Sequence, residues 1–293
     1  MNIVDAHHHI WRQATLPWLQ GPEVPRIFGP YAPLRRDYLA ADYLADLAGT
    51  GVTASVFVQA NVAPTDALDE ARWVAETAGG APVGAIVAGA DLASASIAQD
   101  LDVLVRVPGV RGVRQQLHWH ANLAYRYAST PDSMLQPDFL RGFTALAERG
   151  LLFELQVFAS QYAHALELVD RFPEVNFVLL HAGMPEDRSA QGDAEWRAGL
   201  TRFAQRPNVV TKLSGLGTFV RRCDVDTWAP VVRATVDIFG PGRCLWGSNF
   251  PVESLWTSYA ELLAVFQRCI EPYDAAERQQ ILAGTARRVY ALA

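Results

Sequence analysis

Cysteine is scarce in this sequence. Only three cysteines occur among the 293 residues, and Cys223 and Cys244 stand far apart with no CxxC spacing. We therefore expect neither a disulfide framework nor a thiolate zinc site, which fits a reducing, cytoplasmic setting.

Basic runs and long apolar runs are missing as well. The formal net charge is −6 with no basic stretch, so bulk electrostatics give no reason to expect nucleic acid or a membrane surface as a partner. No run of about eighteen apolar residues predicts a membrane span. The chain does not open with a basic region followed by an apolar one, so no secretory signal is expected. Half of the residues are hydrophobic, enough for one large α/β domain or two smaller ones.

A histidine cluster follows the first apolar run. Side chains two apart along a strand point the same way, so His7 and His9 are predicted to share one side with Asp5, while His8 faces the other. Two imidazoles aimed at one point suit a divalent metal or a substrate carbonyl. A surface cluster or an affinity-tag scar is the alternative, but a tag is usually longer and lies in a Gly/Ser-rich context.

The segment after this cluster is rich in proline and aromatic residues. Residues 18–37 contain four prolines, which argue against a regular element and for a functional loop or lid. Its Arg26, Tyr31, Arg35 and Arg36 suit an anionic substrate, although ordinary surface arginines are the alternative. A second irregular loop is predicted over residues 121–137.

Apolar strand patterns then alternate with helical ones, such as the helix predicted over residues 66–78. With the opening run there are eight predicted strands, the later seven at residues 53–59, 81–90, 110–117, 151–158, 175–180, 208–213 and 243–247. This count and the chain length predict an α/β fold, a (β/α)₈ TIM barrel, formed by one domain over residues 1–293. A doubly wound sheet would carry a Gly-rich loop after its first strand, where this chain has histidines.

Active sites of such barrels lie at the carboxyl ends of the strands. Polar residues recur at these ends: His7, His9, Gln59, Asn61, Asp91, His118, His120, Gln156, His181, Ser214 and Asn249. The sequence therefore predicts a polar site at one face of the barrel.

Five motifs in this order resemble the amidohydrolase-related TIM-barrel hydrolases of the amidohydrolase superfamily, a branch with sugar-acid lactonases and pyrone-dicarboxylate lactonase. They are Asp5–Trp11 (DAHHHIW), Val110–Arg114 (VRGVR), Leu180–Gly183 (LHAG), Lys212–Gly215 (KLSG) and Trp246–Pro251 (WGSNFP). The resemblance implies a small-molecule substrate and hydrolysis of an ester or lactone by water. It also implies that His7, His9 and His181 bind one divalent metal, Zn²⁺ or Mn²⁺, or polarise the carbonyl where no metal is present.

The chain departs from the family pattern at Asn249. The family normally has an aspartate there, which binds metal and takes the proton from water. An amide has no basic lone pair near neutral pH, so Asn249 can orient a water but cannot carry its proton away. A two-metal site is not expected, because strand four offers Arg114 where binuclear members have lysine, and strand five has no histidine.

Another group must then activate the water. His118 and His120 repeat the two-residue spacing and are the candidate bases, with a stacked pair that only shapes the pocket as the alternative. Glu253 is a third candidate, although a lone loop glutamate is usually solvated. Asp5 is interpreted as a partner of a histidine N–H.

Arg114 is predicted to anchor a substrate carboxylate, with an ion pair to Glu154 as the alternative. Further substrate-binding candidates are Gln156, Tyr31, Arg36 and Lys212, the last sharing a strand face with Ser214. The leading hypothesis is a lactonase-like hydrolase of a small carboxylated or hydroxylated lactone or ester. The alternatives are a metal-dependent decarboxylase of an aromatic or unsaturated acid and a barrel that binds without turnover. Such barrels often pair, so a homodimer is possible.

Overall fold

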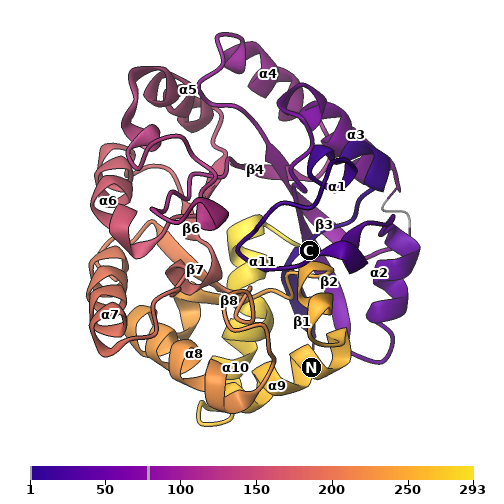
Figure 1. Ribbon diagram of the computed structural model, residues 1–293, viewed down its shortest axis with the longest axis vertical. Helices are drawn as coiled ribbons and strands as arrows, with labels where there is room; N and C mark the ends of the chain where they lie inside the picture. Colours follow the sequence, from indigo (N-terminus) through magenta and orange to yellow (C-terminus); the bar gives the residue numbers. More distant parts are fainter. Residues whose placement is uncertain (1, 78–79) are drawn as a thin grey trace.

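The computed structural model describes residues 2–77 and 80–293 and forms a (β/α)₈ barrel (Figure 1). Eight parallel strands follow one another around the sheet in chain order. They are β1 (Ile3–His8), β2 (Val52–Val58), β3 (Val83–Gly89), β4 (Val110–Arg114), β5 (Leu152–Leu155), β6 (Phe177–Leu179), β7 (Val209–Leu213) and β8 (Cys244–Trp246). The predicted fold is confirmed, and each predicted strand overlaps an observed one.

Helices surround the strands in the outer ring of Figure 1. The main ones are α2 (Ala40–Asp46), α3 (Ala67–Thr77), α4 (Ile97–Leu104), α5 (Pro137–Glu148), α6 (Tyr162–Arg171), α7 (Ala190–Ala204), α8 (Val225–Phe239) and α9 (Tyr259–Cys269). The helix predicted over residues 66–78 corresponds to α3, and its predicted last residue lies outside the described residues. Within the described ranges, no helix has the length and apolar character that crossing a membrane requires.

The barrel is joined between its first and last strands just beyond β8. The main-chain N–H of Asn249 donates to the carbonyl of His7 at 2.7 Å, and that of His9 donates to Phe250 at 2.8 Å. A Cβ at Gly247 would lie 2.5 Å from Cβ of His7, so only glycine permits this approach.

Two apolar layers stabilise the barrel. Val4, Val56 and Val178 belong to an inner cluster between the strands, while larger side chains fill the layer between strands and helices. The C-terminal segment closes the amino-terminal end of the barrel through α10 (Ala275–Gln279), a π-helical turn (Gln280–Gly284) and α11 (Thr285–Tyr290). Tyr290 of α11 joins the inner cluster. The open end is therefore the carboxyl end of the strands.

Candidate active site

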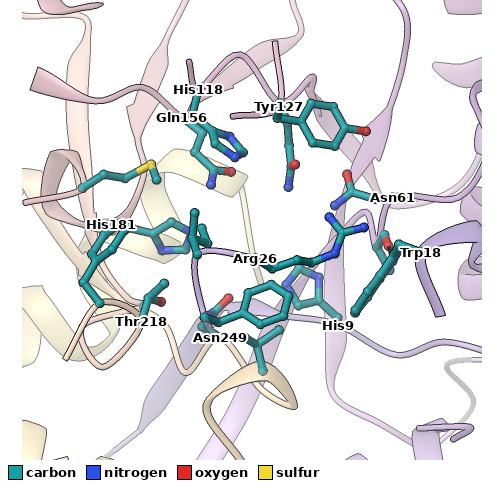
Figure 2. Close-up of a pocket in the computed structure, with 18 of the residues that line it drawn as sticks. His9, Trp18, Arg26, Asn61, His118, Tyr127, Gln156, His181, Thr218 and Asn249 are labelled. Carbon is teal, nitrogen blue, oxygen red and sulfur yellow. Dashed lines mark hydrogen bonds between the residues drawn. The ribbon is translucent and has the colours of Figure 1, made fainter. Parts of the chain in front are cut away.

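Strand ends converge on one pocket at the carboxyl end of the barrel (Figure 2). It has about 910 Å³ of empty space, including the part open to solvent. Its lining includes His9 after β1, His118 after β4, Gln156 after β5, His181 after β6 and Asn249 after β8. These five predicted site residues come from five different strand ends, as expected for a barrel site.

His7 lies beneath this lining, fully buried, and brings a third imidazole to His9 and His181. The ring centroid of His7 is 5.1 Å from that of His9 and 4.9 Å from that of His181. Gly215 makes room for the last ring, because a Cβ there would lie 2.6 Å from Nδ1 of His181 and the backbone φ is +59°.

Hydrogen bonds determine which ring nitrogens are free. Nδ1 of His9 lies 2.6 Å from the carbonyl oxygen of Val58, so Nδ1 carries the hydrogen and Nε2 keeps its lone pair. Nδ1 of His181 lies 2.9 Å from Oγ of Ser214, while both ring nitrogens of His7 are buried without a partner. Burial and then Arg114 lower the pKa of His9 to about 3. Burial also holds the pKa values of His7 and His181 well below the usual range, so all three rings are neutral at neutral pH.

The chemistry of these three rings fits a divalent metal. Neutral imidazole nitrogens with the opposite nitrogen hydrogen-bonded, as in His9 and His181, are typical zinc donors, and three histidines suffice at some catalytic zinc sites. In the described parts of the chain, however, no group of three or more His, Cys, Asp or Glu side chains already has a metal-binding arrangement. The three imidazole rings would therefore have to reorient before they could bind one metal ion jointly. The donor atoms are present, but they are not yet arranged as ligands.

Asp5 does not share the face of His7, contrary to the sequence-based prediction. Strand β1 contains a β-bulge where it pairs with β2. Asp5 pairs with Ser55 and His8 with Phe57, so β1 has one more residue than β2 over this stretch. This bulge turns the Asp5 carboxylate toward the helices, where it accepts hydrogen bonds from the hydroxyls of Tyr43 and Tyr259 at 2.9 and 2.8 Å. Its link to His7 is the main-chain N–H, at 3.1 Å, and not the ring.

The side chain of Asn249 is hydrogen-bonded to Glu253 on the side away from the pocket. Nδ2 of Asn249 donates to Oε1 of Glu253 at 3.5 Å, and Nε1 of Trp256 donates to Oε2 at 2.7 Å. The expectation of a solvated Glu253 is wrong, because the side chain is fully buried, and burial raises its pKa to about 8. The amide NH₂ of Asn249 therefore points to Glu253, which leaves its Oδ1 for the pocket.

His118 and His120 separate in the structure. His118 lines the pocket, whereas His120 is absent from the lining, and its Nε2 lies 3.9 Å from Glu186. Strand β4 ends at Arg114, so strand alternation no longer governs these positions. Burial, followed by the charges of Arg114 and Arg26, lowers the pKa of His118 to about 3.

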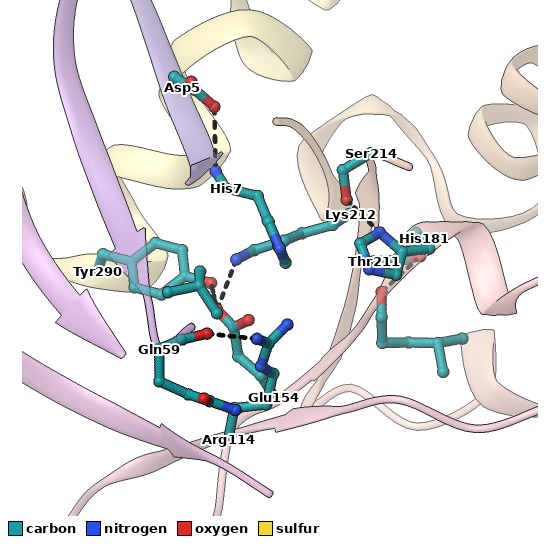
Figure 3. A network of polar contacts seen from close by, with 12 residues as sticks. Asp5, His7, Gln59, Arg114, Glu154, His181, Thr211, Lys212, Ser214 and Tyr290 are labelled. Atoms are coloured by element: carbon teal, nitrogen blue, oxygen red, sulfur yellow. Dashed lines mark hydrogen bonds and ion pairs between the residues drawn. The ribbon is translucent and has the colours of Figure 1, made fainter. Parts of the chain in front are cut away.

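A buried polar network lies among the strands beneath the histidines (Figure 3). Nζ of Lys212, the sole lysine of the chain, lies 2.5 Å from Oε1 of Glu154, and the Tyr290 hydroxyl donates to the same oxygen at 2.6 Å. Lys212 and Glu154 are both fully buried, and burial lowers the pKa of Lys212 to about 8. Lys212 therefore lies below the pocket lining.

Arg114 does line the pocket, and Glu154 pairs with Lys212 instead of with it. One guanidinium nitrogen of Arg114 donates to the carbonyl of Gln59 at 2.5 Å, while its Nε is buried without a partner. Burial lowers the pKa of Arg114 to about 10, which leaves it charged at neutral pH.

Tyr31 and Arg36 lie away from the pocket. Tyr31 is fully buried under the first loop, where its ring packs on Trp18 and its hydroxyl accepts a hydrogen bond from the N–H of Val24. Arg36 is exposed and pairs with Asp42 at 3.1 Å. The structure therefore gives these two candidates no contact with a ligand in the pocket.

Further lining residues come mainly from the loops: Trp18, Arg26, Phe28, Asn61, Arg126, Tyr127, Met184, Thr218 and Phe219. The sequence had already indicated Asn61 as a polar strand-end residue and Arg26 as a candidate for an anionic substrate. Residues such as Arg126, Met184 and Thr218 were missed, because loop positions follow no period.

A family model described as Amidohydrolase matches residues 4–292. The chain belongs to this family. It is 33% identical over 303 residues to an L-fucono-1,5-lactonase of Burkholderia multivorans, covering 99% of this chain and 96% of that protein. It is 32% identical to an uncharacterized protein of Sinorhizobium fredii, covering 98% of both.

Among solved structures, an amidohydrolase from Burkholderia multivorans with bound zinc is 31% identical, with a TM-score of 0.83 and full coverage of both chains. The family resemblance predicted from the five motifs is thus confirmed, and with it the assignment as an amidohydrolase-type hydrolase. A divalent metal is consistent with this family.

Proposed function

We propose that this amidohydrolase opens a small carboxylated or hydroxylated lactone, or a related ester, by attack of water on the carbonyl. The observation that carries the proposal is the convergence of His9, His181, His118 and Asn249 on one pocket. The 33% identity to an L-fucono-1,5-lactonase supports the lactone as the substrate class.

The polar side chains of the pocket divide into acceptors and donors. Oδ1 of Asn249 accepts hydrogen bonds and suits a hydrogen of the attacking water, and so does Nε2 of His9 where no metal is bound to it. Arg114 and the side-chain amide of Gln156 are donors that suit the carbonyl oxygen as it gains negative charge. A metal held by His7, His9 and His181 would polarise the carbonyl and acidify a bound water.

His118 is the proposed general base, because it lines the pocket and Asn249 cannot take a proton. A pKa of about 3 makes His118 a weak base in the free protein. The positive charges of Arg114 and Arg26 are two of the causes that lower this pKa. A negatively charged substrate near them would offset their effect and make His118 a stronger base.

The test is a pH-monitored hydrolysis screen of sugar-acid lactones, carboxylated lactones and simple esters. We expect hydrolysis of at least one lactone class, and we expect His118→Gln to lower kcat about 100-fold or more, as for loss of a general base. His164→Gln, on α6 outside the pocket, is the matched control.

The same screen distinguishes the alternatives. Release of CO₂ from aromatic acids with no lactone hydrolysis would instead support the decarboxylase. Lactone binding without turnover by the metal-supplemented protein would favour a binding barrel.

A further inference from the structure

Arg26 reaches the pocket from the loop between β1 and α2 (Figure 2). Its guanidinium carbon lies 5.5 Å from the ring centroid of Trp18 and 5.8 Å from that of Tyr31. Nε of Arg26 is buried with no hydrogen-bond partner, and no carboxylate in the described residues forms an ion pair with this side chain. The guanidinium of Arg26 thus packs near two aromatic rings, and no acidic side chain of the described ranges neutralises its charge.

Two other arginines of this loop have polar partners outside the pocket. Arg35 donates to the carbonyls of Gln20 and Gly21 at 3.3 and 2.7 Å, and Arg36 pairs with Asp42. Only Arg26 of these three lines the pocket. Of these three arginines, Arg26 is therefore the one whose guanidinium is available to a ligand in the pocket.

The pocket is positive although the chain is acidic overall. Arg26, Arg114 and Arg126 line it, and no Asp or Glu stands among the described lining residues. Arg126 already donates to the carbonyl of His120 at 2.9 Å, which leaves Arg26 and Arg114 the better placed for a ligand. Unpaired guanidinium groups in a partly closed pocket bind carboxylates through charge-assisted, bidentate hydrogen bonds.

We propose that the substrate is an anionic lactone whose carboxylate binds Arg26, with Arg114 on the carbonyl side of the same pocket. This inference rests on the proposed lactonase function. It restricts the preferred substrates to anionic lactones and excludes neutral sugar lactones as the preferred class. Arg26 is then the residue that determines specificity. Arg26 and His118 line the same pocket, so the bound carboxylate shares that pocket with the proposed base.

A matched pair of substrates tests the proposal: 5-oxotetrahydrofuran-2-carboxylate and its neutral carboxamide. Water opens the acid to 2-hydroxyglutarate, breaking the acyl C–O bond. We expect kcat/KM to be about 10- to 100-fold higher for the acid, the range for a hydrogen-bonded charge. Arg26→Gln is expected to remove this preference by lowering kcat/KM for the acid about 10- to 100-fold, toward the value for the carboxamide.

Arg35→Gln is the matched control, because it removes an equal charge from the same loop at a residue outside the pocket. Thermal unfolding of both variants checks that the loop change leaves the fold intact. Arg26→Lys keeps the charge without the planar fork and is expected to retain part of the preference.

Binding of 2-hydroxyglutarate, measured by calorimetry, separates the inference from the proposed function. Binding that Arg26→Gln weakens, with no hydrolysis of any lactone, would support the anion site and overturn the lactonase. Hydrolysis of both substrates with no preference, or a preference that survives Arg26→Gln, would overturn the inference and leave the lactonase standing. Absence of both binding and hydrolysis would overturn both.

Discussion

Asn249 and Glu253 form a buried pair in which the amide Nδ2 donates to Oε1 of the carboxyl group at 3.5 Å. The motif resemblance predicts that Asn249 stands where the family normally has its aspartate. Glu253 lies four residues later, and burial raises its pKa to about 8. A carboxyl group is thus present beside the last strand, but behind the pocket. An asparagine is compatible with the neighbouring Glu253, whereas an aspartate at position 249 would place two carboxyl groups side by side.

Asn249→Asp is therefore expected to lower activity at pH 7 by at least about 10-fold, since two adjacent carboxyls share one proton and titrate as a coupled pair. Asn249→Asp combined with Glu253→Gln is expected to recover activity, because the aspartate then ionises alone. The pH dependence of kcat/KM for the two variants measures this. A single Asn249→Asp variant more active than the natural protein at pH 7 would contradict the pairing.

Metal content tests the donor set. Tag-free protein, analysed by mass spectrometry before any chelator is added, is expected to hold about one zinc or manganese per chain if His7, His9 and His181 form the site. His7→Ala is expected to lose it. His8→Ala is the matched control, because His8 faces away and its ring stacks on Tyr43 at 3.9 Å. Equal loss in both variants, or a metal that survives His7→Ala, would exclude this donor set.

Lys212 pairs with Glu154 below the pocket lining, so we expect its removal to affect stability. Lys212→Met leaves Glu154 buried without its cation, which is expected to lower the free energy of unfolding by about 3–5 kcal/mol. Lys212→Met with Glu154→Leu removes both charges and is expected to cost less than the single change. Urea unfolding measures both. A double variant less stable than Lys212→Met would show that the pair is not the source of the loss.

Glu70 makes stability depend on pH. Burial raises its pKa to about 7 from 4.5, so its stabilising contribution is complete below pH 4.5 and is lost as the pH rises through 7. At pH 8, Glu70→Gln is expected to be more stable than the natural protein by up to about 3 kcal/mol, while the two converge at pH 4.5. Glu76→Gln, exposed on the same helix, should change neither value. A Glu70→Gln effect that is constant with pH would refute the assignment.

The sequence by itself determined the barrel. Eight apolar strand patterns separated by helical ones predicted the strand order, because parallel strands joined by helices in this number close into a ring. Polar residues at strand ends were also readable, since they interrupt an apolar run where the strand stops. His9, His118, Gln156, His181 and Asn249 were found in this way.

Tertiary structure decided what each of these residues touches. The bulge in β1 that turns Asp5 outward depends on pairing with β2, which no local pattern reveals. The burial of Glu253 and Lys212, and the separation of His118 from His120, likewise arise from packing against distant segments. Arg26 was one of four candidates in the first loop for contact with an anionic substrate. Only the folded loop shows that it alone of the four lines the pocket, because loop conformation is set by tertiary contacts and not by sequence period.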